Sequence, residues 1–202
     1  MYQMGRQVYD LLSIDDVSSA RSRAFFKREE SEDSFSLHLN EGVAELTSRM
    51  QALLKDGIIF RNCIFTGHGN SGVIFLGSDE ISRTVWYNLF YDKGYDRLFP
   101  FKDARLYFAG CNVAEDPHGW AFLEAAARSL LKYAGGSAFG WTSAGFGSPF
   151  SGHERHFWGD TKAVMVSDGG GSLRYFRNWK LITDGAGLPI RPDESSDPNP
   201  KY

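Results

Sequence analysis

Two short motifs of the chain place glycines beside a side chain that can do chemistry. Gly67-His68-Gly69 follows the apolar run at residues 58–65, and Gly110-Cys111-Asn112 follows the run at residues 105–109. A thiol is a good nucleophile only as the thiolate, and a nearby imidazole favours the thiolate or delivers a proton to the leaving group. His68 and Cys111 are therefore candidates for acyl-transfer chemistry.

Each of these two residues taken singly is weak evidence. A cysteine at a strand end is most often a packing residue, and a histidine between glycines is most often part of a surface turn. Their joint position says more, because ligands bind beyond the carboxyl ends of the strands in an open parallel sheet. The chain between the motifs is long enough for a helical crossover between neighbouring strands. The backbone N–H groups of Gly69 and Cys111 are then candidate oxyanion-hole donors.

The pattern of apolar residues predicts the elements that position these motifs. Strand-like and helix-like segments alternate, which is typical of an α/β domain with a mostly parallel sheet. We expect strands at residues 8–14, 35–39, 58–65, 73–76, 105–109, 137–142, 163–166 and 173–176, the last two forming a hairpin. We expect helical segments at residues 17–30, 43–54, 81–90 and 117–134.

Polar and turn-forming residues are expected to set the helix ends. Asn40 is expected to cap the helix that follows it, and Gly57 to end that helix. Asp116 and Pro117 suit the N-cap and the first helical position of the last helix, which Gly135-Gly136 stops.

The composition is that of one well-packed domain. The chain has 202 residues, of which 42% are hydrophobic and 15% aromatic, and this excludes a disordered chain. We expect one α/β domain at residues 1–183 and an irregular or disordered tail at residues 184–202, rich in Gly, Pro, Asp and Ser. The net charge of −3 and the lack of a long basic run argue against nucleic-acid binding and give no support for attachment to an anionic membrane.

The sequence also carries expectations about the compartment. No run approaches the ~18 apolar residues that a membrane span requires, so no membrane span is expected. Residues 1–16 carry acids early and lack the basic and long apolar regions of a signal peptide. Two cysteines, Cys63 and Cys111, are too few for a disulfide framework. The expected localisation is cytoplasmic, while export by a route without a signal stays open.

His153 and His156 invite interpretation as a metal site. Zinc-protease helices use H-E-x-x-H, which sets two imidazoles one helical turn apart, and this H-x-x-H run lacks that spacing. Glycines and a proline just before the run favour a loop. No metal ligand is assigned, and Cys63 inside its apolar run is expected to be a buried residue.

Two longer runs resemble a known family. IFTGHGNSGVIFLG (64–77) and LYFAGCNVAEDPHGWAFLEAAARSL (106–130) resemble the two catalytic blocks of caspase-like (clan CD) cysteine peptidases. They are most similar to the bacterial branch that includes CHAT-type domains and the related domain of large bacterial surface proteins. The strand end Gly140-Trp141-Thr142-Ser143 also resembles that branch, and the similarity spans roughly residues 34 to 147.

The resemblance implies a fold and a site. The fold would be a three-layer α/β sandwich with a mostly parallel central sheet, flanked by helices on both faces, and with substrate peptide bound over the strand ends. His68 would be the catalytic histidine and Cys111 the nucleophile, with the Gly69 and Cys111 amides in the oxyanion hole. The chemistry needs no metal and no organic cofactor. Candidate substrate-binding residues are Asn70, Asn112, Trp141 and Ser143.

One departure limits what carries over. The cysteine lies in Ala-Gly-Cys-Asn-Val rather than the Gln-Ala-Cys-x-Gly of animal caspases, so specificity for aspartate is not carried over. The leading hypothesis is a cysteine endopeptidase acting on protein or peptide substrates, controlled by self-cleavage or a regulatory protein partner. A second hypothesis is a catalytically silent module of the same fold that binds a peptide or partner protein. A third keeps the Cys-His pair but transfers the acyl group to an amine or cleaves a non-peptide amide.

Overall fold

The structure, a computed structural model, describes residues 7–16, 33–143, 145–147, 154–156 and 159–192. Strands of the main sheet are β1 (Val8–Asp16), β2 (Ser34–Leu39), β3 (Ile59–Thr66), β7 (Arg105–Phe108), β8 (Gly136–Trp141), β11 (Thr161–Val166), β12 (Leu173–Arg177) and β13 (Lys180–Leu181). These strands form one eight-stranded sheet in the order β13-β12-β11-β8-β7-β3-β1-β2. The β-branched and aromatic runs predicted as strands are confirmed as strands, and all of them except residues 73–76 belong to this one sheet.

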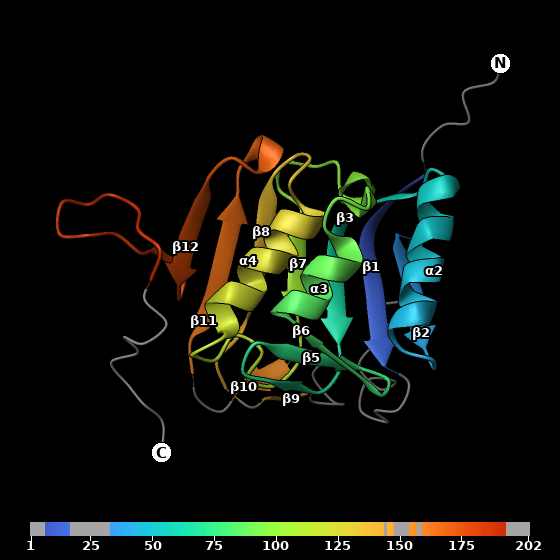
Figure 1. The fold of residues 1–202 in the computed structure, drawn as a ribbon, viewed down its shortest axis with the longest axis horizontal. Helices are drawn as coiled ribbons and strands as arrows, with labels where there is room; N and C mark the ends of the chain where they lie inside the picture. Colours follow the sequence, from blue (N-terminus) through green and yellow to red (C-terminus); the bar gives the residue numbers. More distant parts are fainter. Residues whose placement is uncertain (1–6, 17–32, 144, 148–153, 157–158, 193–202) are drawn as a thin grey trace.

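The sheet has a parallel half and an antiparallel half. The pairs β2–β1, β1–β3, β3–β7 and β7–β8 are parallel, so the mostly parallel sheet predicted from the sequence is confirmed. The pairs β8–β11, β11–β12 and β12–β13 are antiparallel, and β11–β12 is the predicted hairpin. In Figure 1 the arrowheads of the parallel strands point to the lower edge of the molecule. Ligand chemistry is expected at that edge.

Two small sheets lie at this same lower edge (Figure 1). One consists of β4 (Gly69–Asn70), β5 (Val73–Leu76) and β6 (Asp79–Ser82), which follow directly on β3. The other pairs β9 (Gly145–Gly147) with β10 (Glu154–His156). Residues 154–156 were expected to be a loop, and that prediction was wrong because they pair with the glycine-containing β9.

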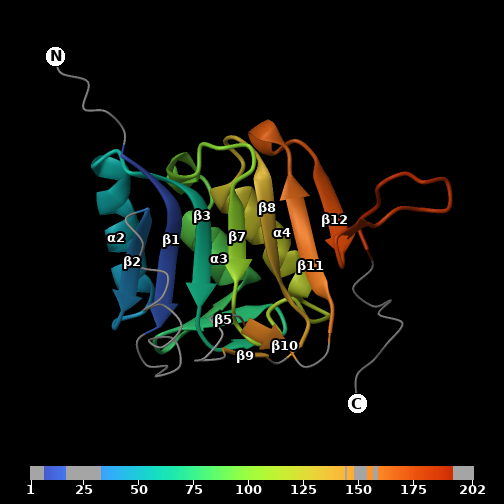
Figure 2. The same ribbon diagram turned by 180° about the vertical axis from the view of Figure 1, so that it is seen from behind.

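Three α-helices of the described residues lie on one face of the sheet (Figures 1 and 2). They are α2 (Val43–Lys55), α3 (Arg83–Phe90) and α4 (Gly119–Leu130). The expected sandwich has helices on both faces. The segment at residues 17–30, predicted to be helical, lies outside the described residues, so the structure shows a sheet with one helical layer.

Aromatic side chains fill the space between the sheet and the helices. Phe65 of β3 and Phe108 of β7 stack at 5.2 Å between ring centroids, and both meet the ring of Trp86 from α3 edge to face. Phe122 of α4 packs on Phe108 at 5.0 Å, and all four side chains are fully buried. This cluster holds the ends of β3 and β7, and therefore the segments that leave them, against the helical layer.

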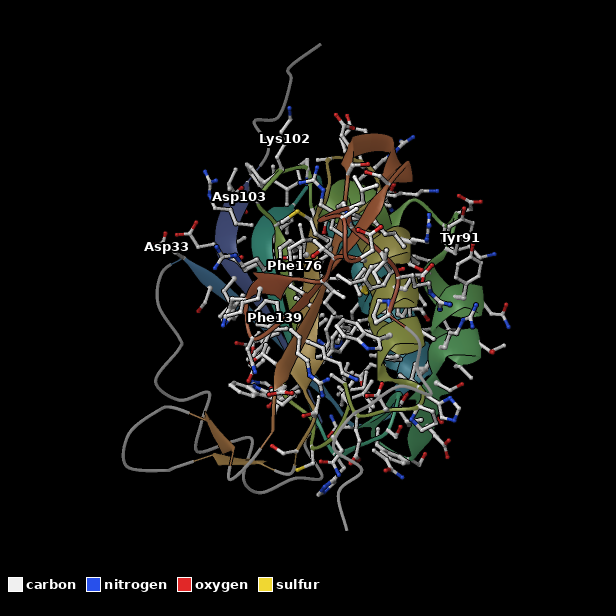
Figure 3. The ribbon with its side chains drawn as sticks, turned by 90° about the vertical axis from the view of Figure 1, so that its left-hand side faces the viewer. Asp33, Tyr91, Lys102, Asp103, Phe139 and Phe176 are labelled. Carbon is white, nitrogen blue, oxygen red and sulfur yellow. The ribbon has the colours of Figure 1, made fainter. Side chains whose placement is uncertain are left out.

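The opposite face of the sheet carries a second row of aromatic residues. Tyr107 stacks on Phe139 of the neighbouring strand at 5.0 Å, and Ala163 separates Phe139 from Phe176 in the strand register. Figure 3 shows Phe139 and Phe176 on the side of the sheet away from Tyr91, which follows α3. The period of two along each strand thus sorts aromatic residues onto both faces.

The start of α2 differs from the prediction. Its N-cap is Gly42 at φ 72°, and no side chain of the cap residue closes the first turn. The prediction that Asn40 caps this helix was wrong, because the Val43 N–H donates to the Asp79 carboxylate at 2.8 Å, from a strand distant in the sequence. Gly57 at φ 72° does end the helix, as predicted.

The start of α4 also differs. The helix begins at Gly119 with His118 as N-cap, so the prediction of Asp116 as N-cap and Pro117 as first helical residue was wrong. The Asp116 carboxylate is instead paired with the ammonium of Lys162 on β11. The helix ends at Leu130, and Gly135 at φ 86° completes the turn into β8.

The segment after residue 183 contains no helix among its described residues, 184–192. It forms a turn in which the Leu188 N–H donates to the Asp184 carboxylate and the Ile190 N–H donates to the Ile182 carbonyl. The rest of the predicted tail, residues 193–202, lies outside the described residues. Within the part of the chain that the structure describes, no helix has the length and apolar character needed to cross a membrane.

Candidate functional site

The register of β3 and β7 brings the two glycine motifs together. Phe65 pairs with Phe108 in this parallel ladder, and His68 and Cys111 each lie three residues beyond their member of that pair. The ladder continues one step further, since the Ala109 N–H donates to the Phe65 carbonyl at 2.8 Å. Both segments therefore leave the same edge of the sheet side by side, as the sequence predicts for the carboxyl ends of neighbouring parallel strands.

The backbones of the two segments are in direct contact. A Cβ built on Gly69 would lie 2.4 Å from the carbonyl oxygen of Cys111, and one built on Gly110 would lie 3.2 Å from the Gly69 Cα and 3.3 Å from the His68 carbonyl oxygen. Only residues without a side chain permit such an approach. Gly69, which follows His68, and Gly110, which precedes Cys111, are thus explained by the packing of one segment on the other.

The segment that carries Cys111 is held from both sides by backbone hydrogen bonds. On the β8 side, the Asn112 N–H donates to the Ser143 carbonyl and the Ala114 N–H to the Trp141 carbonyl, each at 3.0 Å. On the β4–β5 side, the Gly72 N–H donates to the Val113 carbonyl at 3.1 Å. Cys111 therefore lies in a segment of fixed backbone, which is what a reacting group requires.

The two cysteines have opposite environments. Cys63, inside β3, is 1% exposed, and burial raises the pKa of its thiol well above the usual range. Cys111 is partly exposed, and His68 is exposed. A buried thiol held in its neutral form is inert toward electrophiles, so the accessible sulfur of this chain is that of Cys111.

The four candidate substrate-binding residues lie around this edge and differ in exposure and in hydrogen bonding. Asn70 is exposed, and its carboxamide oxygen accepts the Ser71 N–H at 2.8 Å. Asn112 adopts a left-handed φ of 58° directly after the cysteine. The Trp141 indole N–H donates to the Tyr107 hydroxyl at 2.5 Å, and Ser143 is buried. The two asparagines therefore present polar groups nearer the surface than Ser143 does.

A histidine that the sequence analysis did not single out has a carboxylate partner. His38 on β2 places its Nδ1 2.6 Å from Oδ1 of the buried Asp15 on β1. Asp15 in turn faces Thr66 across the β1–β3 register, so the pair lies at the same edge as His68. The alternation of His38 with Phe35, Leu37 and Leu39 carried no signal of this pairing, because it depends on which strand lies beside β2.

His38 lies too far along the sheet to be the partner of Cys111. In the order β2-β1-β3-β7, three strand spacings separate β2 from β7, which is about 14 Å at ~4.8 Å per spacing. One spacing separates β3 from β7. The strand order therefore favours His68 over His38 as the imidazole beside the thiol.

The structure also contains a cavity away from this edge. It has a volume of about 340 Å³ and lies between α3 and α4. Its lining includes Arg83, Tyr87, Asn88, Glu124 and Arg128. None of the residues predicted from the sequence to form the site lines it.

The described residues contain no candidate metal site. In that part of the chain, no three His, Cys, Asp or Glu side chains are grouped so as to hold a metal ion. His156 lies in β10, and His153 lies outside the described residues.

No protein-family model, no curated protein and no solved structure matches the chain.

Proposed function

We propose that this chain is a caspase-like cysteine endopeptidase in which Cys111 is the nucleophile and His68 handles the protons. The observation that carries the proposal is the in-register departure of both residues from β3 and β7, with the Gly69 and Cys111 backbones in contact. The resemblance of residues 64–77 and 106–130 to the catalytic blocks of clan CD peptidases points to the same two residues.

The chemistry follows from the two groups. The Cys111 thiolate attacks the carbonyl carbon of the scissile peptide bond, and the carbonyl electron pair moves to the oxygen to give a tetrahedral oxyanion. The oxyanion collapses to a thioester as the C–N bond breaks, and the leaving amine takes a proton from the His68 imidazolium. Neutral His68 then removes a proton from water, whose oxygen attacks the thioester. Release of the carboxylic acid restores the thiolate and the imidazolium.

The backbone supplies the electrostatic part of this mechanism. The amide nitrogen of Cys111 lies 3.0 Å from the point where a Gly69 Cβ would sit, so the Gly69 and Cys111 amides adjoin. Two adjoining amide donors are what an oxyanion hole uses, and one lost donor typically reduces kcat by about 10²–10³-fold. The Gly69 and Cys111 N–H groups are proposed for that role.

Cleavage of a proteome-derived peptide library, read by mass spectrometry, tests the proposal. The wild type is compared with Cys111→Ala, and with Cys63→Ala as the matched control. We expect cuts that the wild type and Cys63→Ala make and that Cys111→Ala does not make. The residues that flank the cuts give the specificity directly.

Other outcomes point to the other hypotheses. Cuts that persist in Cys111→Ala would remove the mechanism. Transfer of an acyl group to an added amine, without hydrolysis, would identify a transferase. If no library cleavage occurs and Cys111→Ala captures the same protein partner as the wild type, the chain is a binding module of this fold.

A further inference from the structure

Lys162 has a position that is unusual for its residue type. It lies on β11, an inner strand of the main sheet, with its side chain 0% exposed. Among the described residues, no other lysine or arginine is buried to this degree. Removal of an ammonium from water is strongly unfavourable unless a partner compensates the charge, so the local structure must give Lys162 such a partner.

The partner is a carboxylate in the segment that carries the cysteine. The Lys162 Nζ lies 2.5 Å from Oδ1 of Asp116, whose side chain is only 13% exposed. The same ammonium lies 4.8 Å from the ring centroid of Trp120, in the first turn of α4. Lys162 therefore contacts both the segment before α4 and the start of the helix itself.

Asp116 is joined to Cys111 through a short, hydrogen-bonded turn. The Glu115 N–H donates to the Asn112 carbonyl at 2.8 Å, and the Gly119 N–H donates to the Glu115 carbonyl at 2.8 Å. Asn112, next to Cys111, has a left-handed φ of 58°, a conformation that Asn adopts more readily than most residues. A displacement of Asp116 would therefore shift the turn that begins at Asn112, next to Cys111.

We propose that Lys162 is a positioning residue for Cys111, acting through Asp116. This inference deepens the proposed function, because it names the side chain that fixes the segment of the nucleophile. The ammonium holds the Asp116 carboxylate by an ion pair, while hydrogen bonds to the chain at the end of β8 and from the β4–β5 turn hold the backbone of the segment. Without the ion pair, the turn at residues 112–115 loses the side-chain contact that anchors it to β11.

The test measures the reactivity of Cys111 and does not depend on peptidase activity. The rate constant for alkylation of Cys111 by iodoacetamide is measured against pH in the wild type, Lys162→Met, Lys162→Arg and Asp116→Asn. Lys132→Met, which breaks the ion pair of Lys132 with Asp92 on the helical side, is the matched control. Thermal melting sets a temperature at which each variant is folded.

We expect Lys162→Met and Asp116→Asn to change the alkylation rate at neutral pH by about tenfold or more, because thiol reactivity follows the pKa and the exposure of the sulfur, and both depend on how the segment is held. Lys162→Arg, which keeps the charge, restores much of the wild-type pH profile, and Lys132→Met leaves it unchanged. If Lys162→Met does not fold, Asp116→Asn and Lys162→Arg decide the question.

Alkylation profiles within twofold of the wild type in folded Lys162→Met or Asp116→Asn would overturn the proposal and leave the pair a purely structural one. The proposed function fails by a different observation, the absence of Cys111-dependent cleavage. In that case the alkylation rates still decide whether Lys162 positions the thiol.

Discussion

Gly69 packs on the backbone of Cys111 with no room for a side chain between them. A Cβ built on Gly69 would lie 2.4 Å from the Cys111 carbonyl oxygen and 2.6 Å from Cγ2 of Val113. Neither neighbour can move away cheaply, because one is backbone and the other belongs to a fully buried side chain. This contact joins the histidine and cysteine motifs, and it makes Gly69 a sensitive position.

Gly69→Ala is therefore expected to displace one motif from the other. We expect a loss of roughly 1–3 kcal/mol in the free energy of unfolding from overpacking, and a fall in Cys111-dependent cleavage of up to about 10²-fold. Urea unfolding and peptide-cleavage kinetics measure the two effects. Gly185→Ala is the matched control, because a Cβ at Gly185 meets nothing within 4 Å. Equal effects of the two substitutions would contradict the contact.

The two cysteines should differ in reactivity in the native protein. Iodoacetamide is expected to modify Cys111 and to spare Cys63, because Cys63 is 1% exposed and burial raises the pKa of its thiol. Mass spectrometry of the intact native protein should show one adduct, and the unfolded protein should show two. Modification of Cys63 at the same rate as Cys111 would mean that β3 opens readily.

His68 and His38, the two histidines at the sheet edge, should differ in their effect on the reactivity of Cys111. His68→Ala is expected to lower the alkylation rate of Cys111 near neutral pH, since His68 follows the strand next to β7. His38→Ala is expected to leave that rate unchanged, because three strand spacings separate β2 from β7. The measurement is the pH dependence of alkylation in both variants. An effect of His38→Ala alone would reverse the assignment.

The capping of α2 gives a test of the fold. Asp79→Ala removes the carboxylate that accepts the Val43 N–H, and should lower the free energy of unfolding by about 1 kcal/mol. Asn40→Ala should have little effect, because the Asn40 interaction with this helix is made by its backbone N–H, which donates to Glu45. Chemical denaturation of both variants checks this order, and a larger effect of Asn40→Ala would contradict it.

Glu45 should make stability depend on pH. Its carboxylate accepts the Asn40 and Glu41 N–H groups at 2.8 and 3.1 Å, and these backbone hydrogen bonds lower the pKa of Glu45 below its ordinary value of 4.5. A carboxyl whose pKa is lower in the folded state stabilises the fold above its unfolded pKa, and this contribution disappears as the pH falls through the folded pKa.

Glu45→Gln is therefore expected to be less stable than the wild type at pH 7 by an amount on the order of 1 kcal/mol. The difference should narrow as the pH falls below 4.5. Urea unfolding across this pH range measures it, and Glu80→Gln on the exposed side of β6 is the control. A difference that stays constant with pH would show that the carboxylate charge contributes nothing.

Much of the fold could be predicted from short-range patterns. The alternation of Phe35, Leu37 and Leu39 with polar residues, and the apolar runs that became β3 and β7, predicted strands because side chains alternate between the two faces of a strand. Gly57 predicted the end of α2, because few other residues adopt its positive φ. The placement of His68 and Cys111 after strand ends follows from the same local reasoning.

What the sequence by itself determined is therefore local: where strands and helices form, and that a histidine and a cysteine follow two apolar strands between glycines. Only the tertiary structure decided which strands are neighbours, and with them the Phe65–Phe108 register and the partners of the polar groups. Asp116 pairs with Lys162 and leaves the cap of α4 to His118, while Asp79 replaces Asn40 at the start of α2. The physical reason is that a charged or hydrogen-bonding side chain takes the best partner within reach in space, and residues far apart in the sequence come within reach only when the sheet is assembled.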